Sequence, residues 1–188
     1  MKRLFLTLLF CFSLTAAYAV VGVGVKYGKS SFDAGVTYSS VDCQSAIDKF
    51  YGFELLLEKD AEIDSLGVNI GLNMYEGGYG KFINIYHHYD KEDASVLSVP
   101  VSIYYKYKVS PLLQVYGGFG ATPAYYSMNH ISKIKVFPHI LFGAEVRLLK
   151  YFALCAEANY NFNAKAQDQY EYIDLSGLSA NLGARLYF

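Results

Sequence analysis

The stretch NLGARLYF, at residues 181–188, decides the fold of this chain. Read backward from Phe188, every second residue as far as Leu178 is apolar, and most residues between them are polar or small. A repeat of two with one apolar and one polar face is the pattern of a β-strand. The stretch therefore predicts a long strand that presents one face to an apolar medium.

The opposite end of the sequence has the three parts of a secretory signal. A basic start is followed by an apolar run at residues 4–14 and by the small-residue cleavage site Ala17-Tyr-Ala19. We predict cleavage between Ala19 and Val20. The signal peptide is then residues 1–19, and residues 20–188 form one exported domain.

Two other readings of this segment fit less well. A transmembrane helix needs about 20 apolar residues, and the run at 4–14 is too short. A lipid anchor would require acylation of Cys11, but Phe10 stands before it where a small residue is expected.

The composition agrees with an all-β membrane protein. Hydrophobic residues make up 53% and charged residues 18% of the chain, and Tyr (19) and Phe (13) are abundant. The apolar excess is spread in alternation and forms no long run, as expected when strands rather than helices face lipid. Without Lys2 and Arg3, 14 basic residues (16 − 2) face 17 acidic ones. This balance gives no sign of nucleic-acid binding.

The exported chain divides into eight alternating segments, long enough to cross a membrane as tilted strands. They lie at about residues 20–40, 51–58, 66–74, 97–108, 113–122, 139–148, 152–162 and 177–188. In the first, the apolar residues change parity after Lys29, which calls for a bulge or a turn. We favour one bulged strand, because bacterial single-chain barrels have even strand counts.

The connections alternate in length. Short turns are expected at 59–62, 110–111 and 149–150, and longer polar loops at 41–44, 76–95, 127–133 and 163–169. Transmembrane barrels have short periplasmic turns and longer outer loops. The sequence therefore predicts an eight-stranded antiparallel up-and-down transmembrane β-barrel.

The polar faces of the strands carry nearly all the strand charges and are expected to fill the lumen. An eight-stranded barrel encloses only enough space for side chains, and buried charges must pair. We predict a luminal ionic network of Lys26, Glu54, Glu58, Lys106, Lys108, Glu145, Arg147, Glu157 and Arg185. His139 is expected to make a polar contact in the same lumen. A soluble lipocalin-like barrel, with the apolar face inside, is the rival fold.

Two cysteines remain after cleavage. Cys43 is expected in an outer loop and Cys155 low in a strand facing the lumen. Because these places are far apart, we predict two free thiols and no disulfide.

The segment YGFELLLE at 51–58, the short turns after Val109 and Leu148, and the ending at 181–188 resemble small porin-like, OmpA-type outer-membrane β-barrel proteins. The resemblance implies the bacterial outer membrane as location and a monomeric state. It implies outer-membrane lipids and lipopolysaccharide, periplasmic chaperones and the outer-membrane assembly machinery as partners. Asn181, Gly183, Leu186 and Phe188 match the positions of the membrane-insertion signal in that class.

The role in the membrane stays open between several readings. A structural or narrow, gated permeation role follows from the filled lumen. An adhesin or ligand-binding role would use the tyrosines predicted near the outer loops: Tyr75, Tyr79, Tyr86, Tyr89, Tyr125, Tyr126, Tyr170 and Tyr172. A lipid A-modifying enzyme is disfavoured, because the loop polar residues form no nucleophile-and-base arrangement. The loop histidines His87, His88 and His130 lack metal-site spacing, so no metal or cofactor is predicted.

Overall fold

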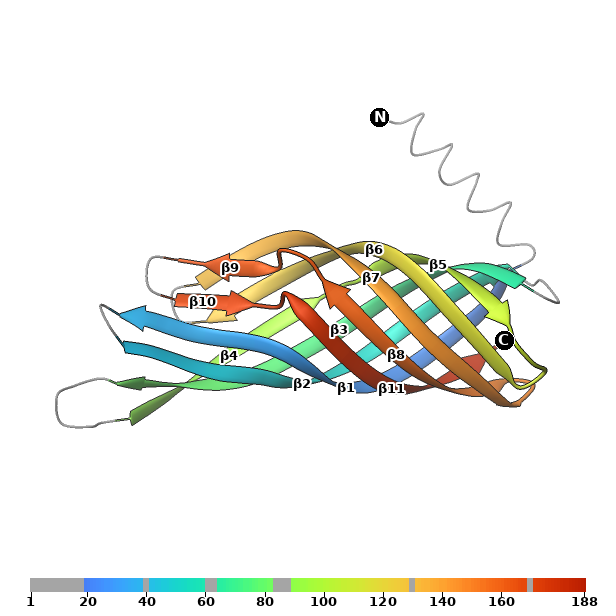
Figure 1. The fold of residues 1–188 in the computed structure, drawn as a ribbon, viewed down its shortest axis with the longest axis horizontal. Helices are drawn as coiled ribbons and strands as arrows, with labels where there is room; N and C mark the ends of the chain where they lie inside the picture. Colours follow the sequence, from blue (N-terminus) through green and yellow to red (C-terminus); the bar gives the residue numbers. More distant parts are fainter. Residues whose placement is uncertain (1–18, 39–40, 60–63, 83–88, 129–130, 169–170) are drawn as a thin grey trace, which may run out of the picture.

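The computed structural model describes residues 19–38, 41–59, 64–82, 89–128, 131–168 and 171–188. In these ranges the chain forms strands that cross and close into an elongated barrel (Figure 1). The strands are β1 (Ala19–Tyr38), β2 (Val41–Lys59), β3 (Asp64–Phe82), β4 (Tyr89–Ser98), β5 (Val101–Lys108), β6 (Leu113–Met128), β7 (Ile131–Leu149), β8 (Phe152–Asn161), β9 (Lys165–Gln167), β10 (Glu171–Asp174) and β11 (Gly177–Tyr187). No helix in the described ranges is long and apolar enough to cross a membrane.

The eleven strands fill eight positions in the barrel wall, because three positions are divided between two strands (11 − 3 = 8). β4 and β5 both pair with β3 and β6, and β10 and β11 both pair with β1. β9 follows β8 along the chain and pairs with β10. β1 also pairs with β2, which closes the antiparallel sheet on itself. The predicted eight-stranded up-and-down barrel is confirmed.

The first strand is continuous, as favoured over a separate hairpin. The register of β1 against β2 shifts between Lys29 and Phe32, at the position where the apolar parity changes. The change of parity has a consequence that the sequence did not reveal. Phe32 and Ala34 are buried while Asp33 between them is exposed, so this half of β1 turns its apolar residues into the lumen.

Three segments predicted as loops are mainly strands, so these predictions were wrong, and the fourth contains a short strand. Residues 41–44 belong to β2, and 76–95 are largely taken up by the ends of β3 and β4. Residues 127–133 are mostly the ends of β6 and β7, and 163–169 contain β9. The physical reason is visible in the register, where pairing continues through Gly77↔Ala94 and Tyr79↔Glu92. Polar side chains thus mark where the apolar surroundings end, whereas backbone pairing continues beyond that level.

The other end of the barrel has tight turns, as predicted. Ser110 accepts hydrogen bonds at its Oγ from the backbone amides of Leu112 (3.4 Å) and Leu113 (3.0 Å), which fixes the turn between β5 and β6. Lys150 and Tyr151 form the turn between β7 and β8. The predicted turn at 59–62 falls mostly outside the described residues. We call this side the short-turn end and the opposite side the hairpin end.

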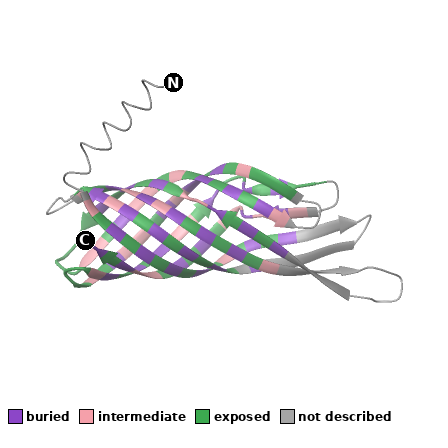
Figure 2. Ribbon diagram, turned by 180° about the vertical axis from the view of Figure 1, so that it is seen from behind, coloured by how far each residue is buried: buried purple, intermediate pink, exposed green. Residues whose placement is uncertain are grey.

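The outer face of the barrel is apolar. Residues alternate between exposed and buried along the strands (Figure 2), and the exposed ones include Val25, Phe53 and Phe142. A soluble barrel would bury these side chains, so the lipocalin-like alternative is wrong. Toward the hairpin end the exposed rows become polar at one residue on each of six strands. This polar limit consists of the exposed residues Lys29, Lys49, Glu76, Ser95 and Ser132 and the half-buried Ser127.

Candidate functional site

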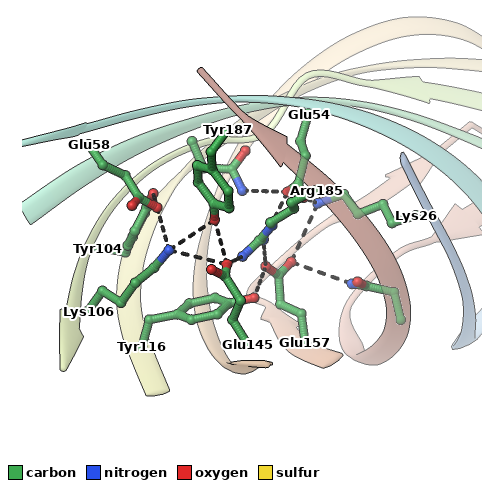
Figure 3. Close-up of polar contacts among 12 residues, drawn as sticks. Lys26, Glu54, Glu58, Tyr104, Lys106, Tyr116, Glu145, Glu157, Arg185 and Tyr187 are labelled. Carbon is green, nitrogen blue, oxygen red and sulfur yellow. Dashed lines mark hydrogen bonds and ion pairs between the residues drawn. The ribbon is translucent and has the colours of Figure 1, made fainter. Parts of the chain in front are cut away.

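The lumen is the site that the sequence singles out, and the structure brings eight of the nine predicted residues together there. Figure 3 shows this site with Arg185 between Glu54, Glu145 and Glu157. We call this set the ionic network: Lys26, Glu54, Glu58, Lys106, Glu145, Arg147, Glu157 and Arg185. Each member forms at least one ion pair with another member. Four carboxylates face four cations, so the network has no net charge.

Arg185, on β11, is the centre of the ionic network. Its Nε lies 2.6 Å and its Nη2 3.1 Å from the two carboxylate oxygens of Glu54, which is a bidentate pair. Its Nη1 donates to Glu145 at 3.1 Å, and Nη2 also donates to Glu157 at 3.3 Å. The side chain is almost completely buried. One guanidinium group therefore neutralises three carboxylates that come from three different strands.

The two lysines of the network also form ion pairs with its carboxylates. Lys26 Nζ lies 3.4 Å from both Glu54 and Glu157. Lys106 Nζ pairs with Glu58 and lies 3.2 Å from Glu145. Since each carboxylate has more than one cationic partner, the buried charges are compensated as a group and not as isolated pairs.

Arg147 lies at the edge of the network nearest the short-turn end. Its Nε is 3.2 Å from Glu145 and its Nη2 is 3.7 Å from Glu58. The Arg147 side chain is 30% exposed, whereas the other network side chains are almost fully buried. Water therefore reaches the network from the short-turn end only as far as this arginine.

Lys108 was predicted in the network, and this prediction was wrong. It is the last residue of β5 and is exposed to solvent. Its parity along the strand is that of the buried Lys106. The strand ends at Lys108, however, and its side chain is exposed there, whereas the side chain of Lys106 is buried.

Sequence reasoning missed three tyrosines and an asparagine that donate to the network carboxylates, and Asn159 and Asn181 also donate to Glu157. Tyr104 donates to Glu58 at 2.6 Å, Tyr187 donates to Glu145 at 2.5 Å, and Tyr116 donates to Glu157 at 3.2 Å. Asn69, on β3, donates to Glu54 at 2.9 Å. With these four residues, each of the eight wall positions contributes a side chain to the network.

Paired glycines were the signal that could have revealed the tyrosines. Tyr104 lies opposite Gly67 and Tyr116 lies opposite Gly143 in the strand register. A Cβ on Gly67 would lie 2.4 Å from the Tyr104 ring, and one on Gly143 would lie 2.3 Å from the Tyr116 ring. Each ring lies flat across its glycine, as aromatic residues do over strand glycines. This position directs the hydroxyl group toward the carboxylates.

A small polar chamber lies on the hairpin side of the network. Lys26 and Glu157 of the network line it on one side, and Phe50 and Tyr75 line it on the other. Its volume is about 20 Å³, which is room for one or two water molecules at roughly 10–15 Å³ each. The chamber is therefore too small for any larger solute.

His139 lies in the wall of this chamber and makes the polar contacts predicted for it. Its Nε2 lies 2.7 Å from the hydroxyl of Ser102, and its Nδ1 lies 2.8 Å from the hydroxyl of Thr122. Both ring nitrogens thus have partners, one on β5 and one on the neighbouring strand β6. This arrangement fixes the ring as part of the wall.

Beyond the chamber the lumen is apolar, which the sequence analysis did not foresee. Fourteen buried residues pack there, and we call them the apolar cluster: Phe32, Ala34, Ile47, Phe50, Tyr75, Ala94, Val96, Ala124, Tyr126, Phe137, Ala164, Ala166, Ile173 and Leu175. Tyr75 and Tyr126 were predicted as surface tyrosines, and both are buried here. The prediction of a polar and charged filling therefore holds for the ionic network and the chamber, and it is wrong for this part of the lumen.

The chain is bent inward to complete the apolar cluster. Asn163 follows β8 in the left-handed conformation, with φ of 51°. Ala164 is then buried, and its carbonyl accepts a hydrogen bond from the Tyr126 hydroxyl at 2.6 Å. The ammonium groups of Lys133 and Lys135 donate to the backbone carbonyls of the last and first residues of β9, Gln167 and Lys165, at 2.9 and 2.7 Å. These contacts hold β9 against β7 over the cluster.

The other predicted positions have the following places. Asn181 is buried on β11, Leu186 and Phe188 are exposed, and the Phe188 amide donates to Val21 at 2.8 Å where β1 meets β11. Cys155 is a buried free thiol. Cys43 belongs to β2 and not to a loop.

The cleavage residue Ala17 and the histidines His87, His88 and His130 lie outside the described residues. Among the described residues, no group of three or more His, Cys, Asp and Glu side chains could hold a metal ion.

A closed antiparallel barrel with an apolar outer face and a filled lumen defines a transmembrane β-barrel protein. The sequence model of the outer membrane protein beta-barrel domain family matches residues 4–186, so this chain belongs to that family and to the bacterial outer membrane. A comparison with curated protein sequences found no match.

Solved structures of small outer-membrane proteins have the same fold. OprG from Pseudomonas aeruginosa has a TM-score of 0.60 at 10% identity, over 90% of this chain and 95% of that one. Neisserial surface protein A has a TM-score of 0.54 at 13% identity, over 89% and 97%. Ail of Yersinia pestis, in complex with the heparin analogue sucrose octasulfate, has a TM-score of 0.51 at 13% identity, over 90% and 99%. At these identities the likeness is one of fold.

Proposed function

We propose that this protein is a closed structural barrel that anchors projecting hairpins at the cell surface. The observation that carries the proposal is the filling of the lumen by three successive layers. These are the neutral ionic network, a chamber with room for one or two waters, and the apolar cluster. An ion entering from the short-turn end would have to displace buried charges and then cross packed side chains.

The cost of such a passage supports a resting state without conduction. Separating one partner of a buried ion pair leaves an uncompensated charge, at a cost of about 3–5 kcal/mol. The apolar cluster offers no hydrogen-bonding groups to replace an ion's hydration shell along most of its surface. The two barriers lie one after the other, so a change in one alone leaves the other in place.

A narrow, gated permeation role is the second candidate, and one observation favours it. Arg185 is shared by three carboxylates, and two of these, Glu54 and Glu157, are also paired with Lys26. Ion pairs of this kind can exchange partners while every charge stays near an opposite one. A path along the wall could then open at a lower cost than breaking an isolated pair.

The substitution Glu157→Gln separates the two candidates. It keeps the shape of the side chain and leaves one excess positive charge in the network. We expect single barrels of this variant to carry no current in a planar bilayer, because the apolar cluster is unchanged. Discrete openings in Glu157→Gln that are absent from the unsubstituted protein would favour the gate.

The projecting hairpins supply the surface that the structural proposal needs. β3 and β4 remain paired beyond Glu76, which belongs to the polar limit, as far as Phe82 and Tyr89. Ail, which shares this fold, is described with a bound heparin analogue. We propose that the hairpins of this protein likewise contact molecules outside the cell, as an adhesin would.

Shortening the β3–β4 hairpin tests this surface role. Joining Gly77 to Ala94 through an Asn-Gly turn removes the tip and keeps the register, because these two residues are paired. We expect cells that display the shortened barrel to lose binding to host cells, while the barrel keeps its heat-modifiable migration in gels. Unchanged cell binding by a correctly folded shortened barrel would contradict the role of this hairpin.

The remaining partners follow from the location. We propose that periplasmic chaperones carry the chain and that the assembly machinery inserts it through β11. This strand contains the signal residues Asn181, Gly183 and Leu186 and lies at the closure with β1. We also propose that the barrel acts as a monomer in the lipid of the outer membrane.

A further inference from the structure

Two lysines lie directly opposite each other on the outer face of the barrel. Lys29 on β1 is the register partner of Lys49 on β2, and both are exposed at the polar limit. Opposed side chains on antiparallel strands have Cβ atoms about 4.5–5.5 Å apart, and like charges at that distance repel. Within the described chain, neither ammonium group lies within 4.0 Å of a carboxylate. The exposed Glu76 is the partner of Lys49 on its other side. The pair therefore keeps a local excess of positive charge.

An apolar groove begins at the same lysine. It is an open hollow of about 700 Å³ on the outer wall over β1, β7, β8 and β11. Small residues form its floor and bulky ones its sides: Ala156, Ala158 and Ala180, with Tyr27, Phe142 and Leu182. The register explains the hollow, because Ala180 lies beside Ala158 on one strand pair and Leu182 lies beside Ala156.

The cationic pair and the groove are continuous. Lys29 is one of the residues that line the groove, and it lies opposite Ala180 in the register of β1 and β11. The groove extends from there into the apolar band, toward the short-turn end. A ligand that fills both parts must have an anionic head at the level of the polar limit and an acyl chain below it.

We propose that this surface binds lipid A, the phosphate-bearing acylated glycolipid of the outer leaflet. A phosphate group lies between Lys29 and Lys49, and one acyl chain lies over the three alanines. The hairpin end of a transmembrane barrel faces outward, which places this part of the polar limit at the headgroups of the outer leaflet. Charge complementarity selects the phosphate, and the apolar floor of three alanines accommodates an acyl chain. This site is independent of the lumen and of the role proposed for it.

The test measures lipid A bound to the full refolded barrel by native mass spectrometry. Phosphatidylcholine nanodiscs supply lipid A, dephosphorylated lipid A or phosphatidylglycerol in separate samples. We expect lipid A to be retained and the other two to be lost. The double variant K29Q/K49Q is expected to bind lipid A about thirtyfold more weakly, from the loss of two lysine–phosphate attractions.

Two further variants separate the site from a general effect of charge. Ala158→Leu fills the groove and keeps both lysines, and we expect it to weaken binding of lipid A. The matched control K59Q/K150Q removes two exposed lysines near the short-turn end, with the same change in charge, and is expected to bind normally. Unchanged binding by K29Q/K49Q, equal weakening by the control, or equal retention of phosphatidylglycerol would overturn the proposal. Heat-modifiable migration verifies that each variant has folded.

Discussion

Replacing Arg185 with methionine is expected to lower the free energy of unfolding by about 3–5 kcal/mol. The substitution leaves a side chain of similar length but removes the charge that Glu54, Glu145 and Glu157 share. Lys26, Lys106 and Arg147 would then be the only cations left in the network. They would have to compensate these three buried carboxylates and also Glu58. Urea unfolding of the protein refolded in lipid vesicles measures the loss.

Two variants frame this result. Lys59→Met removes a positive charge from the exposed last residue of β2 and is expected to change stability by less than about 0.5 kcal/mol. Arg185→Lys keeps the charge but loses the bidentate contact with Glu54, so its effect should lie between the other two. A loss below about 1 kcal/mol for Arg185→Met would mean that the ionic network is not held together by this arginine.

Replacing Phe137 with alanine is expected to cost about 3–5 kcal/mol of stability. Phe137 is 1% exposed and belongs to the apolar cluster. The substitution loses the free energy gained by transferring the ring out of water, and it leaves a cavity inside the lumen. The rigid wall around the cluster limits how far neighbouring side chains can close that cavity.

Phe119→Ala is the matched control, on the adjacent strand β6. Phe119 is 67% exposed and faces the apolar surroundings of the barrel. This substitution also loses the free energy gained by transferring a ring out of water. Lipid chains fill the vacated space, however, so that no cavity remains. The loss for Phe137→Ala should therefore be clearly the larger in the same vesicles. Equal losses would contradict a packed cluster across the lumen.

The fold could be predicted from sequence because successive residues of a strand point to opposite faces, and lipid favours apolar residues on one of these faces. Both effects produce the same repeat of two in the sequence. The rows that end at Phe188 and those around Phe53 and Phe142 point outward for this reason. The luminal position of Glu54, Glu157 and Arg185 follows too, since charges on the outer face would meet lipid. Which residues lie opposite each other on neighbouring strands, however, depends on the register between those strands. The sequence of a single strand does not contain that register.

The parts of the structure that could not be predicted lie where the alternation of apolar and polar residues no longer separates the outer face from the lumen. Beyond the polar limit the exposed positions are polar and the lumen can be apolar, so Phe32 reverses the pattern of the lower barrel. At Phe137 the strand is apolar on both faces, because Val136 beside it is exposed. Parity alone could not separate Lys106 from Lys108, because only the end of β5 decides which one is covered. Tyr116 has the buried parity of its strand, but its role as a donor depends on Gly143 on the next strand.

We propose that the ionic network, the water-sized chamber and the apolar cluster together leave no continuous path through the lumen. The most direct test records the current through single refolded barrels of the unsubstituted protein in a planar bilayer, with insertion verified by heat-modifiable migration. We predict a trace that stays at the level of the bare bilayer, without discrete steps, at both polarities. Discrete steps of reproducible amplitude would contradict the closed barrel.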